Sequence, residues 1–171
     1  TARGLGLPII GDIELFARSG ARPTVGITGT NGKSTVTTLV AKMAESAGIR
    51  ARAGGNLSPP ALDLLDGGTT ELFVLELSSY QLEATTSLEL AAATVLNVTP
   101  DHLDRYADIS AYAAAKARIY DRAAVAVTNL DDPLVPAMVR PGQPQISFSL
   151  LADRGADYCL VEAAGQQWLM A

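Results

Sequence analysis

Thr24-Val-Gly-Ile-Thr-Gly-Thr-Asn-Gly-Lys-Ser-Thr35 decides the fold, because it joins an apolar strand to a glycine-rich turn and then to the start of a helix. Such a turn points successive backbone N–H groups and a helix N-terminus at one place, which favours a phosphate group there. The strict P-loop pattern requires glycine five residues before Gly32, whereas this chain has Ile27 at that position. The stretch therefore predicts a nucleotide site without indicating what the nucleotide is used for.

Short apolar runs rich in β-branched residues recur along the chain, and helical patterns lie between them. Most of these runs lack polar alternation, as expected of strands that are covered on both faces of a parallel sheet. A helix is predicted over 34–47, and Ser110 is predicted to cap a second helix that contains Tyr112 and Tyr120. The predicted strands are 24–28, 72–77, 94–98, 124–129 and 146–150.

These elements together predict an α/β fold with a doubly wound, mostly parallel sheet that carries the P-loop. The apolar face of the first helix is predicted to hold Val36, Leu39, Val40, Met43 and Ala47. At the C-terminal end, 157–162 and 167–171 predict a small antiparallel hairpin.

Length and composition exclude several classes of protein. The chain has 171 residues, of which 48% are apolar and 18% charged, so one globular domain is expected. A net charge of −5 argues against a nucleic-acid surface, and no apolar run is long enough to span a membrane. Cys159 is the single cysteine, which fits a reducing compartment, so we expect a cytoplasmic protein, and one that is a monomer. Because the chain begins with Thr1, it reads as a piece of a longer protein.

Polar residues follow two of the predicted strands directly. Glu76-Leu-Ser-Ser79 comes after one apolar run and Asn97-Val-Thr-Pro-Asp-His102 after the next. Ligands of doubly wound sheets bind beyond the carboxyl ends of the strands, so both segments are expected to share an edge with the glycine-rich turn. The acidic pair Asp131 and Asp132, by contrast, is predicted to be solvated.

Four segments together resemble the central ATP-binding domain of the Mur ligases, which add amino acids to the peptidoglycan precursor. The resemblance covers about residues 10–150. It rests on the segments Gly26-Ile-Thr-Gly-Thr-Asn-Gly-Lys-Ser34, Gly54-Gly-Asn56 with Pro60-Ala-Leu62, Glu76-Leu-Ser-Ser-Tyr-Gln-Leu82, and Asn97-Val-Thr-Pro-Asp-His-Leu-Asp-Arg-Tyr106 followed by Tyr112-Ala-Ala-Ala-Lys116. Gly11-Asp-Ile-Glu-Leu-Phe16 and the Glu76 block most resemble the member that adds D-glutamate.

The resemblance implies ATP-dependent amide ligation, in which UDP-MurNAc-L-alanine is phosphorylated to an acyl phosphate and D-glutamate then attacks it. It also implies that residues 1–171 form an incomplete central domain, without the N-terminal UDP-binding domain and the C-terminal amino-acid-binding domain. The isolated chain is therefore expected to be catalytically silent.

Candidate nucleotide-binding residues follow from the turn itself. Lys33 is predicted to neutralise the β- and γ-phosphates, and Thr30 and Asn31 to contact phosphate through backbone groups. The predicted ATP-binding set is Gly29, Thr30, Asn31, Gly32, Lys33, Ser34 and Thr35.

Candidate ligands for Mg²⁺, with two ions expected, come mainly from the resemblance. Ser34 and Glu76 offer oxygen atoms, which hard cations prefer. The family position of His102 helps to bind a second Mg²⁺, although histidine is not a usual ligand for this ion.

In the family the lysine at the position of Lys116 is carbamylated, and the residue at the position of Asn56 lies near the transferred phosphoryl group. Here Ser58 replaces the glycine of the common Gly-Asn-Ile-Gly form. Lys33, Lys116, His102 and Asn56 are thus the candidate catalytic residues, and Ser34, Glu76, His102 and Lys116 the candidate metal ligands.

Three other functions stay open from the sequence. Another Mur ligase or a folylpolyglutamate synthase uses the same fold on a different acceptor. A P-loop kinase or NTPase is a different class of enzyme, against which Ile27 and the Lys116 motif argue. A nucleotide-binding module without catalytic chemistry is the non-enzymatic alternative.

Overall fold

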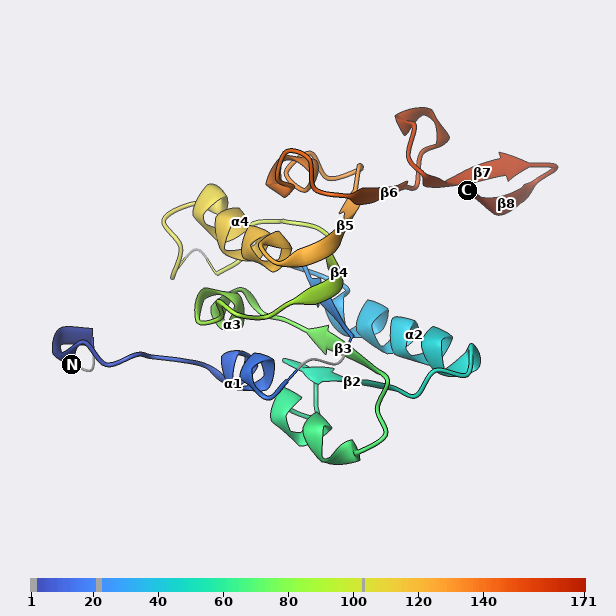
Figure 1. The fold of residues 1–171 in the computed structure, drawn as a ribbon. Coiled ribbons are helices and arrows are strands. Elements are labelled where there is room, and N and C mark those ends of the chain that lie inside the picture. The colour runs from blue at the N-terminus through green and yellow to red at the C-terminus, as the bar shows by residue number, and fades with distance from the viewer. Residues whose placement is uncertain (1–2, 21–22, 103) are drawn as a thin grey trace.

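The computed structural model describes residues 3–20, 23–102 and 104–171, and Figure 1 shows a central sheet with helices on both sides. The eight strands lie in the order β2-β3-β1-β4-β5-β6-β7-β8. Every neighbouring pair is parallel except β7 and β8, which are antiparallel. The predicted doubly wound sheet with a C-terminal hairpin is therefore confirmed. The strands are β1 (Thr24–Thr28), β2 (Ala51–Gly55), β3 (Leu72–Glu76), β4 (Leu90–Val95), β5 (Ala123–Asn129), β6 (Gln145–Ser149), β7 (Tyr158–Ala163) and β8 (Gln166–Met170).

The helices divide unequally between the two faces of the sheet. One core cluster joins the sheet to α1, α3 and α4, and the second joins it to α2 (Figure 1). No helix in the described part of the chain is long and apolar enough to cross a bilayer. The α-helices are α1 (Asp12–Arg18), α2 (Lys33–Ser46), α3 (Ser79–Glu83) and α4 (Ile109–Ala117), and the 3₁₀ turns are η1 (Arg3–Leu5), η2 (Ala61–Gly67), η3 (Arg118–Tyr120), η4 (Pro136–Met138) and η5 (Ala152–Arg154).

The face that α2 turns toward the sheet agrees with the predicted one only at Val36 and Val40, which pack against the second core cluster. Leu39 and Met43 are 55% and 62% exposed, whereas Thr37 and Ala41 are buried. Small side chains let the helix approach the sheet closely, so the row that includes Thr37, Ala41 and Ala44 faces inward. Hydrophobicity alone could not select this row, because two of the larger apolar residues, Leu39 and Met43, lie on the exposed side of the helix.

Two strand predictions required correction. The strand predicted over 94–98 is β4, which spans Leu90–Val95, and β2 was not predicted at all. Both are rich in alanine or glycine, which have low strand propensity and appear in strands only where neighbouring strands pair with them. Residues 96–98 instead leave the sheet and form the loop beyond β4.

The start of α4 and the C-terminal hairpin show how local sequence sets element ends. Asp108, not Ser110, caps α4, because its Oδ1 accepts the N–H of Ala111 at 2.8 Å.

The hairpin turns at Ala164 and Gly165, whose φ angles of 54° and 72° match the two-residue turn that suits twisted antiparallel strands.

Helix α1 is attached to the loop after α3 through the buried carboxylate of Glu14. Its Oε2 accepts the backbone N–H groups of Thr86 and Ser87 at 2.8 and 3.0 Å, and its Oε1 accepts the Ser87 hydroxyl. Arg18 donates to the same carboxylate at 2.8 Å. These donors, with the Thr86 N–H first among them, lower the pKa of Glu14 to about 2.

We predict that Glu14→Gln destabilises the protein by about 3 kcal/mol at neutral pH, because a buried carboxylate with charge-assisted hydrogen bonds is lost. The folded-state pKa lies below the unfolded one, so this stabilisation is present above pH 4.5 and disappears as the pH falls toward 2. Urea unfolding at several pH values measures the difference. Arg18→Ala is the control, and we expect a smaller effect because Arg18 is half exposed. An unchanged midpoint for Glu14→Gln at pH 7 would contradict the prediction.

Candidate functional site

The glycine-rich turn connects β1 to α2 at the carboxyl edge of the sheet. Gly32 precedes α2 in a left-handed conformation (φ 80°), which lets the chain enter the helix directly from the turn. Lys33 folds back over the turn, and its Nζ donates to the carbonyl oxygens of Gly29 and Thr30, both at 3.0 Å. The first N–H groups of a helix lack partners within the helix, so the start of α2 presents donors to an anion.

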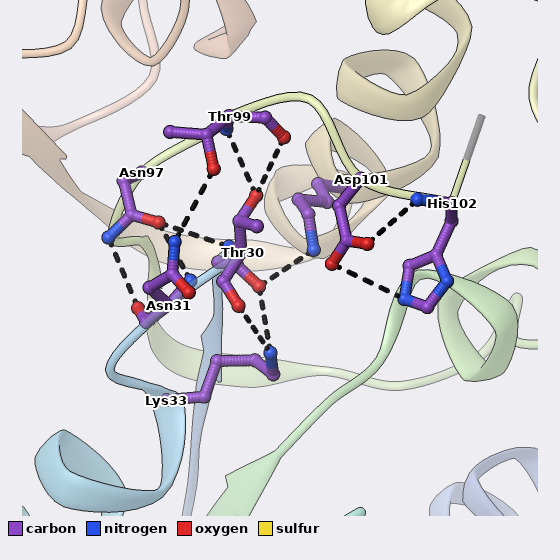
Figure 2. A network of polar contacts seen from close by, with 9 residues as sticks. Thr30, Asn31, Lys33, Asn97, Thr99, Asp101 and His102 are labelled. Atoms are coloured by element: carbon purple, nitrogen blue, oxygen red, sulfur yellow. Dashed lines mark hydrogen bonds and ion pairs between the residues drawn. The ribbon is translucent and has the colours of Figure 1, made fainter.

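Asn97, in the loop after β4, occupies two of the N–H groups that were predicted to face phosphate. The N–H groups of Thr30 and Asn31 donate to Asn97 Oδ1 at 3.1 and 2.9 Å (Figure 2). Asn97 Oδ1 is therefore the side-chain acceptor of both groups, and their contact with phosphate stays a prediction. The groups available to phosphate belong to the residues that follow, from Gly32 into the first turn of α2, which includes Thr35.

Ser34, Asn56 and Glu76 form one hydrogen-bonded set from three different elements. Glu76 ends β3 and is only 2% exposed, and its Oε2 accepts the Ser34 hydroxyl at 2.6 Å. Its Oε1 accepts the Asn56 side-chain amide at 2.7 Å. Close approach makes this possible, because a Cβ on Gly55 would lie 2.4 Å from the Glu76 carbonyl oxygen. A hydroxyl and a carboxylate this close together are oxygen donors that fit Mg²⁺.

Lys116 is a buried cation that meets the same turn from α4. It is 1% exposed, and its Nζ donates to the carbonyl oxygen of Gly29 at 2.8 Å. The Nζ also lies 4.4 Å from the centre of the Tyr112 ring. Burial, and after it the positive charge of Lys33, lowers the pKa of Lys116 to about 7. A substantial fraction of this amine is therefore neutral near pH 7.

His102 lies at the rim of the site and not within it. It is 45% exposed and pairs with Asp101 at 3.6 Å (Figure 2). Its left-handed backbone (φ 53°) is held by the N–H groups of Arg105 and Tyr106, which donate to its carbonyl oxygen. Its ring centre lies 6.0 Å from that of Tyr112. No hydrogen bond among the described residues joins His102 to the other candidate metal ligands, and no cluster of three His, Cys, Asp or Glu suited to a metal occurs among them.

The structure thus brings the candidate residues into two groups. Lys33 and Lys116 meet on the carbonyl oxygen of Gly29, while Ser34 and Asn56 meet on Glu76. The adjacent positions of Lys33 and Ser34 in α2 join the groups.

Three polar residues of this edge have roles that the sequence did not indicate. Asn97 holds the turn, and Asp132 accepts the N–H of Val98 at 2.6 Å. Asp131 accepts from Ser149 and Leu150, so the pair predicted to be solvated instead fastens two loops. An asparagine directly after the apolar β4 run was the available signal for Asn97. Nothing local distinguished Asp131 and Asp132 from exposed loop residues.

Comparison with known proteins assigns the family. The Mur ligase middle domain matches residues 27–158, so this chain belongs to the Mur ligase family. It is 51% identical over 169 residues to the UDP-N-acetylmuramoylalanine–D-glutamate ligase of Nitrosococcus oceani, covering 99% of this chain and 37% of that protein. The ligase of the same name from Haemophilus influenzae is 53% identical over 171 residues, covering 99% of this chain and 38% of that protein. The chain therefore spans well under half the length of these relatives.

Solved Mur ligases share the fold. A UDP-N-acetylmuramoyl-L-alanyl-D-glutamate–2,6-diaminopimelate ligase matches with a TM-score of 0.70 and 27% identity, over 89% of this chain and 39% of that one. The MurF ligase of Thermotoga maritima in complex with ADP matches with a TM-score of 0.71 and 20% identity, over 94% of this chain and 44% of that one. The second likeness concerns the fold alone.

We predict that Lys33→Ala raises the pKa of Lys116, because it removes a neighbouring positive charge that favours the neutral amine. NMR titration of the lysine side-chain signals measures the pKa of Lys116 in the wild type and in the Lys33→Ala variant. Lys42→Ala removes an exposed cation from α2 and should leave the Lys116 signal unchanged. A wild-type Lys116 that titrates like an exposed lysine would contradict the structure of the site.

Proposed function

We propose that this chain is the ATP-binding middle domain of a ligase that joins D-glutamate to UDP-MurNAc-L-alanine. The single observation behind the proposal is the meeting of Lys33, Lys116 and the Ser34–Glu76 pair around one turn. Phosphoryl transfer needs mainly positioning and neutralisation of charge, and this edge provides both cations and oxygen ligands. Relatives more than 50% identical bear the name of this ligase, which supports D-glutamate over the acceptors of other family members.

In this proposal the nucleotide phosphates lie at the start of α2. Lys33 exchanges its two carbonyl acceptors in the turn for phosphate oxygens, while the backbone N–H groups from Gly32 onward donate to the same anion. The carboxylate of UDP-MurNAc-L-alanine attacks the γ-phosphorus to give an acyl phosphate and ADP. The D-glutamate amine then displaces phosphate to give the amide.

Ser34 and Glu76 are the proposed holders of the first Mg²⁺, which supplies charge neutralisation to the phosphate oxygens when bound. Glu76 is held in place by Asn56, so the amide of Asn56 orients the carboxylate before any ion arrives. A second Mg²⁺ would lie toward His102 and Lys116, whose side chains both contact the ring of Tyr112.

Lys116 would serve such a second site as a carbamate and not as a cation. The neutral amine attacks CO₂, a C–N bond forms, and one proton is released, which leaves an anionic oxygen donor on the side chain. A pKa of about 7 makes the neutral amine available for this reaction near neutral pH. The change converts a buried positive charge into a ligand that hard cations prefer.

We predict that protein supplied with ¹³C-bicarbonate and Mg²⁺ shows a carbamate signal by ¹³C NMR, because Lys116 presents a neutral amine. Lys116→Arg should abolish this signal and Lys42→Arg should preserve it, since Lys42 is an exposed lysine of α2. A wild-type spectrum with no carbamate under these conditions would remove this part of the proposal.

The remaining parts of the reaction are assigned to other domains. The proposal places UDP binding in an N-terminal domain and D-glutamate binding in a C-terminal domain of a longer, monomeric, cytoplasmic protein. Residues 1–171 then supply the ATP and Mg²⁺ sites and are inactive by themselves.

The experiment that tests the function measures ADP release by the complete ligase that contains this chain. We expect release to need both UDP-MurNAc-L-alanine and D-glutamate, with L-glutamate, L-lysine and diaminopimelate inactive as acceptors. Lys33→Ala should lower kcat/KM by about 10²-fold or more, because a charge that stabilises the transition state is lost. Lys42→Ala is the matched control, and equal activity with another acceptor would overturn the assignment.

A further inference from the structure

The side chain of Asn97 is bonded to the phosphate loop through both of its polar atoms. Its Oδ1 accepts the N–H groups of Thr30 and Asn31, and its Nδ2 donates to the carbonyl oxygen of Asn31 at 3.1 Å (Figure 2). A carboxamide can accept two N–H bonds through its oxygen while its nitrogen, a separate atom, donates to a carbonyl. The acceptor and donor of the asparagine side chain therefore pair with two N–H groups and one carbonyl oxygen of the turn.

Further bonds between the same two segments close the network. The N–H of Thr30 also approaches the carbonyl oxygen of Asn97 at 3.0 Å. The Thr30 hydroxyl donates to the carbonyl oxygen of Thr99 and accepts the N–H of Thr99, at 3.3 and 3.1 Å. We call this set, formed by Thr30, Asn31, Asn97 and Thr99, the loop clamp.

The Asn97 side of the loop clamp is fixed to the sheet. The N–H of Leu96 donates to the carbonyl oxygen of Thr28 at 2.9 Å, and Asn129 donates to the carbonyl oxygen of Leu96 at 2.8 Å. The two segments also touch, because a Cβ on Gly29 would lie 3.0 Å from that of Leu96. The Asn97 segment is thus held by hydrogen bonds to β1 and β5, and its contacts with the turn set the conformation of the turn.

We propose that Asn97 is a positioning residue for the phosphate loop, acting through Thr30 and Asn31 without touching the nucleotide. Gly29 directly precedes the clamped residues, and its carbonyl oxygen receives both Lys33 and Lys116. The loop clamp therefore sets the point where the two cations meet, as well as the direction of the N–H groups that follow. The inference rests on the proposed function only in assigning the phosphates of ATP to this turn.

The first test is amide hydrogen exchange of the protein without nucleotide. We expect slow exchange at the N–H groups of Thr30 and Asn31 in the wild type. Asn97→Ala should speed exchange at Asn31, because its acceptor is lost, and should change Thr30 less, because the backbone carbonyl oxygen of residue 97 still accepts the Thr30 N–H. Asn97→Asp retains the acceptor oxygen and should keep both slow. This contrast separates the specific bonds from general loosening, and it remains available if the alanine variant folds poorly.

The second test is calorimetric titration with Mg-ATP, with Lys33→Ala as the negative control for the site. We expect Asn97→Ala to weaken binding of Mg-ATP by about tenfold or more. The substitution removes three hydrogen bonds, and each contributes a factor of about 2 to 10 to the equilibrium that keeps the loop in its binding conformation. Gln143→Ala is the matched control, because Gln143 also donates to two backbone carbonyls but lies before β6, away from the turn. It should lower stability and leave the affinity for Mg-ATP unchanged.

The two tests separate failure of the inference from failure of the function. Wild-type affinity in a folded Asn97→Ala variant, or fast exchange of both amides in the wild type, overturns the role of Asn97. A wild type that binds no Mg-ATP refutes the nucleotide site, and the exchange contrast between the alanine and aspartate variants then decides the loop clamp alone.

Discussion

The carbonyl oxygen of Gly29 is the constraint on which the candidate site depends, because two lysines from different helices donate to it. Lys33 reaches it from the first turn of α2 and Lys116 from α4 on the opposite face of the sheet. Two positive charges at one acceptor repel each other, and burial adds to the cost of charge on Lys116. The lowered pKa of Lys116 is the physical result of this arrangement. Binding of a polyanion, or loss of the Lys116 charge, would relieve the repulsion between the two lysines.

The same edge of the sheet places a basic group, Lys33 and Lys116, beside an acidic group formed around Glu76. Lys33 belongs to the basic group and Ser34 to the acidic group around Glu76, so one helix turn connects them. This is the arrangement expected where a metal ion and a cation share the charge of one phosphate chain. Glu76 remains buried because Asn56 and Ser34 satisfy its oxygens, which shows why the ends of β2 and β3 and the start of α2 must converge.

Close packing on both faces keeps those strand ends in register. Small residues bring α2 near β1 to β3, and Glu14 fastens α1 to the loop after α3 on the other face. The loops beyond β4 and β5 are then joined by Asp132 and Asn129, so the turn, the Asn97 segment and the end of β5 form one continuous set of hydrogen bonds. The site is therefore a property of the whole edge, and no single loop could maintain it.

The sequence by itself determined the parallel α/β fold, the P-loop-like turn, the C-terminal hairpin and the family, because these depend on periodicity and on contiguous motifs. It also identified Lys33, Ser34, Glu76 and Lys116 as candidates. Only the tertiary structure decided that α2 packs through Thr37 and Ala41, that β4 begins at Leu90, and that Asn97 takes the N–H groups of Thr30 and Asn31. The reason is that alanine-rich strands and neutral polar side chains have weak local preferences. Their roles are set by partners distant in sequence that only the folded sheet brings together, and for Asn97 these partners lie more than sixty residues away.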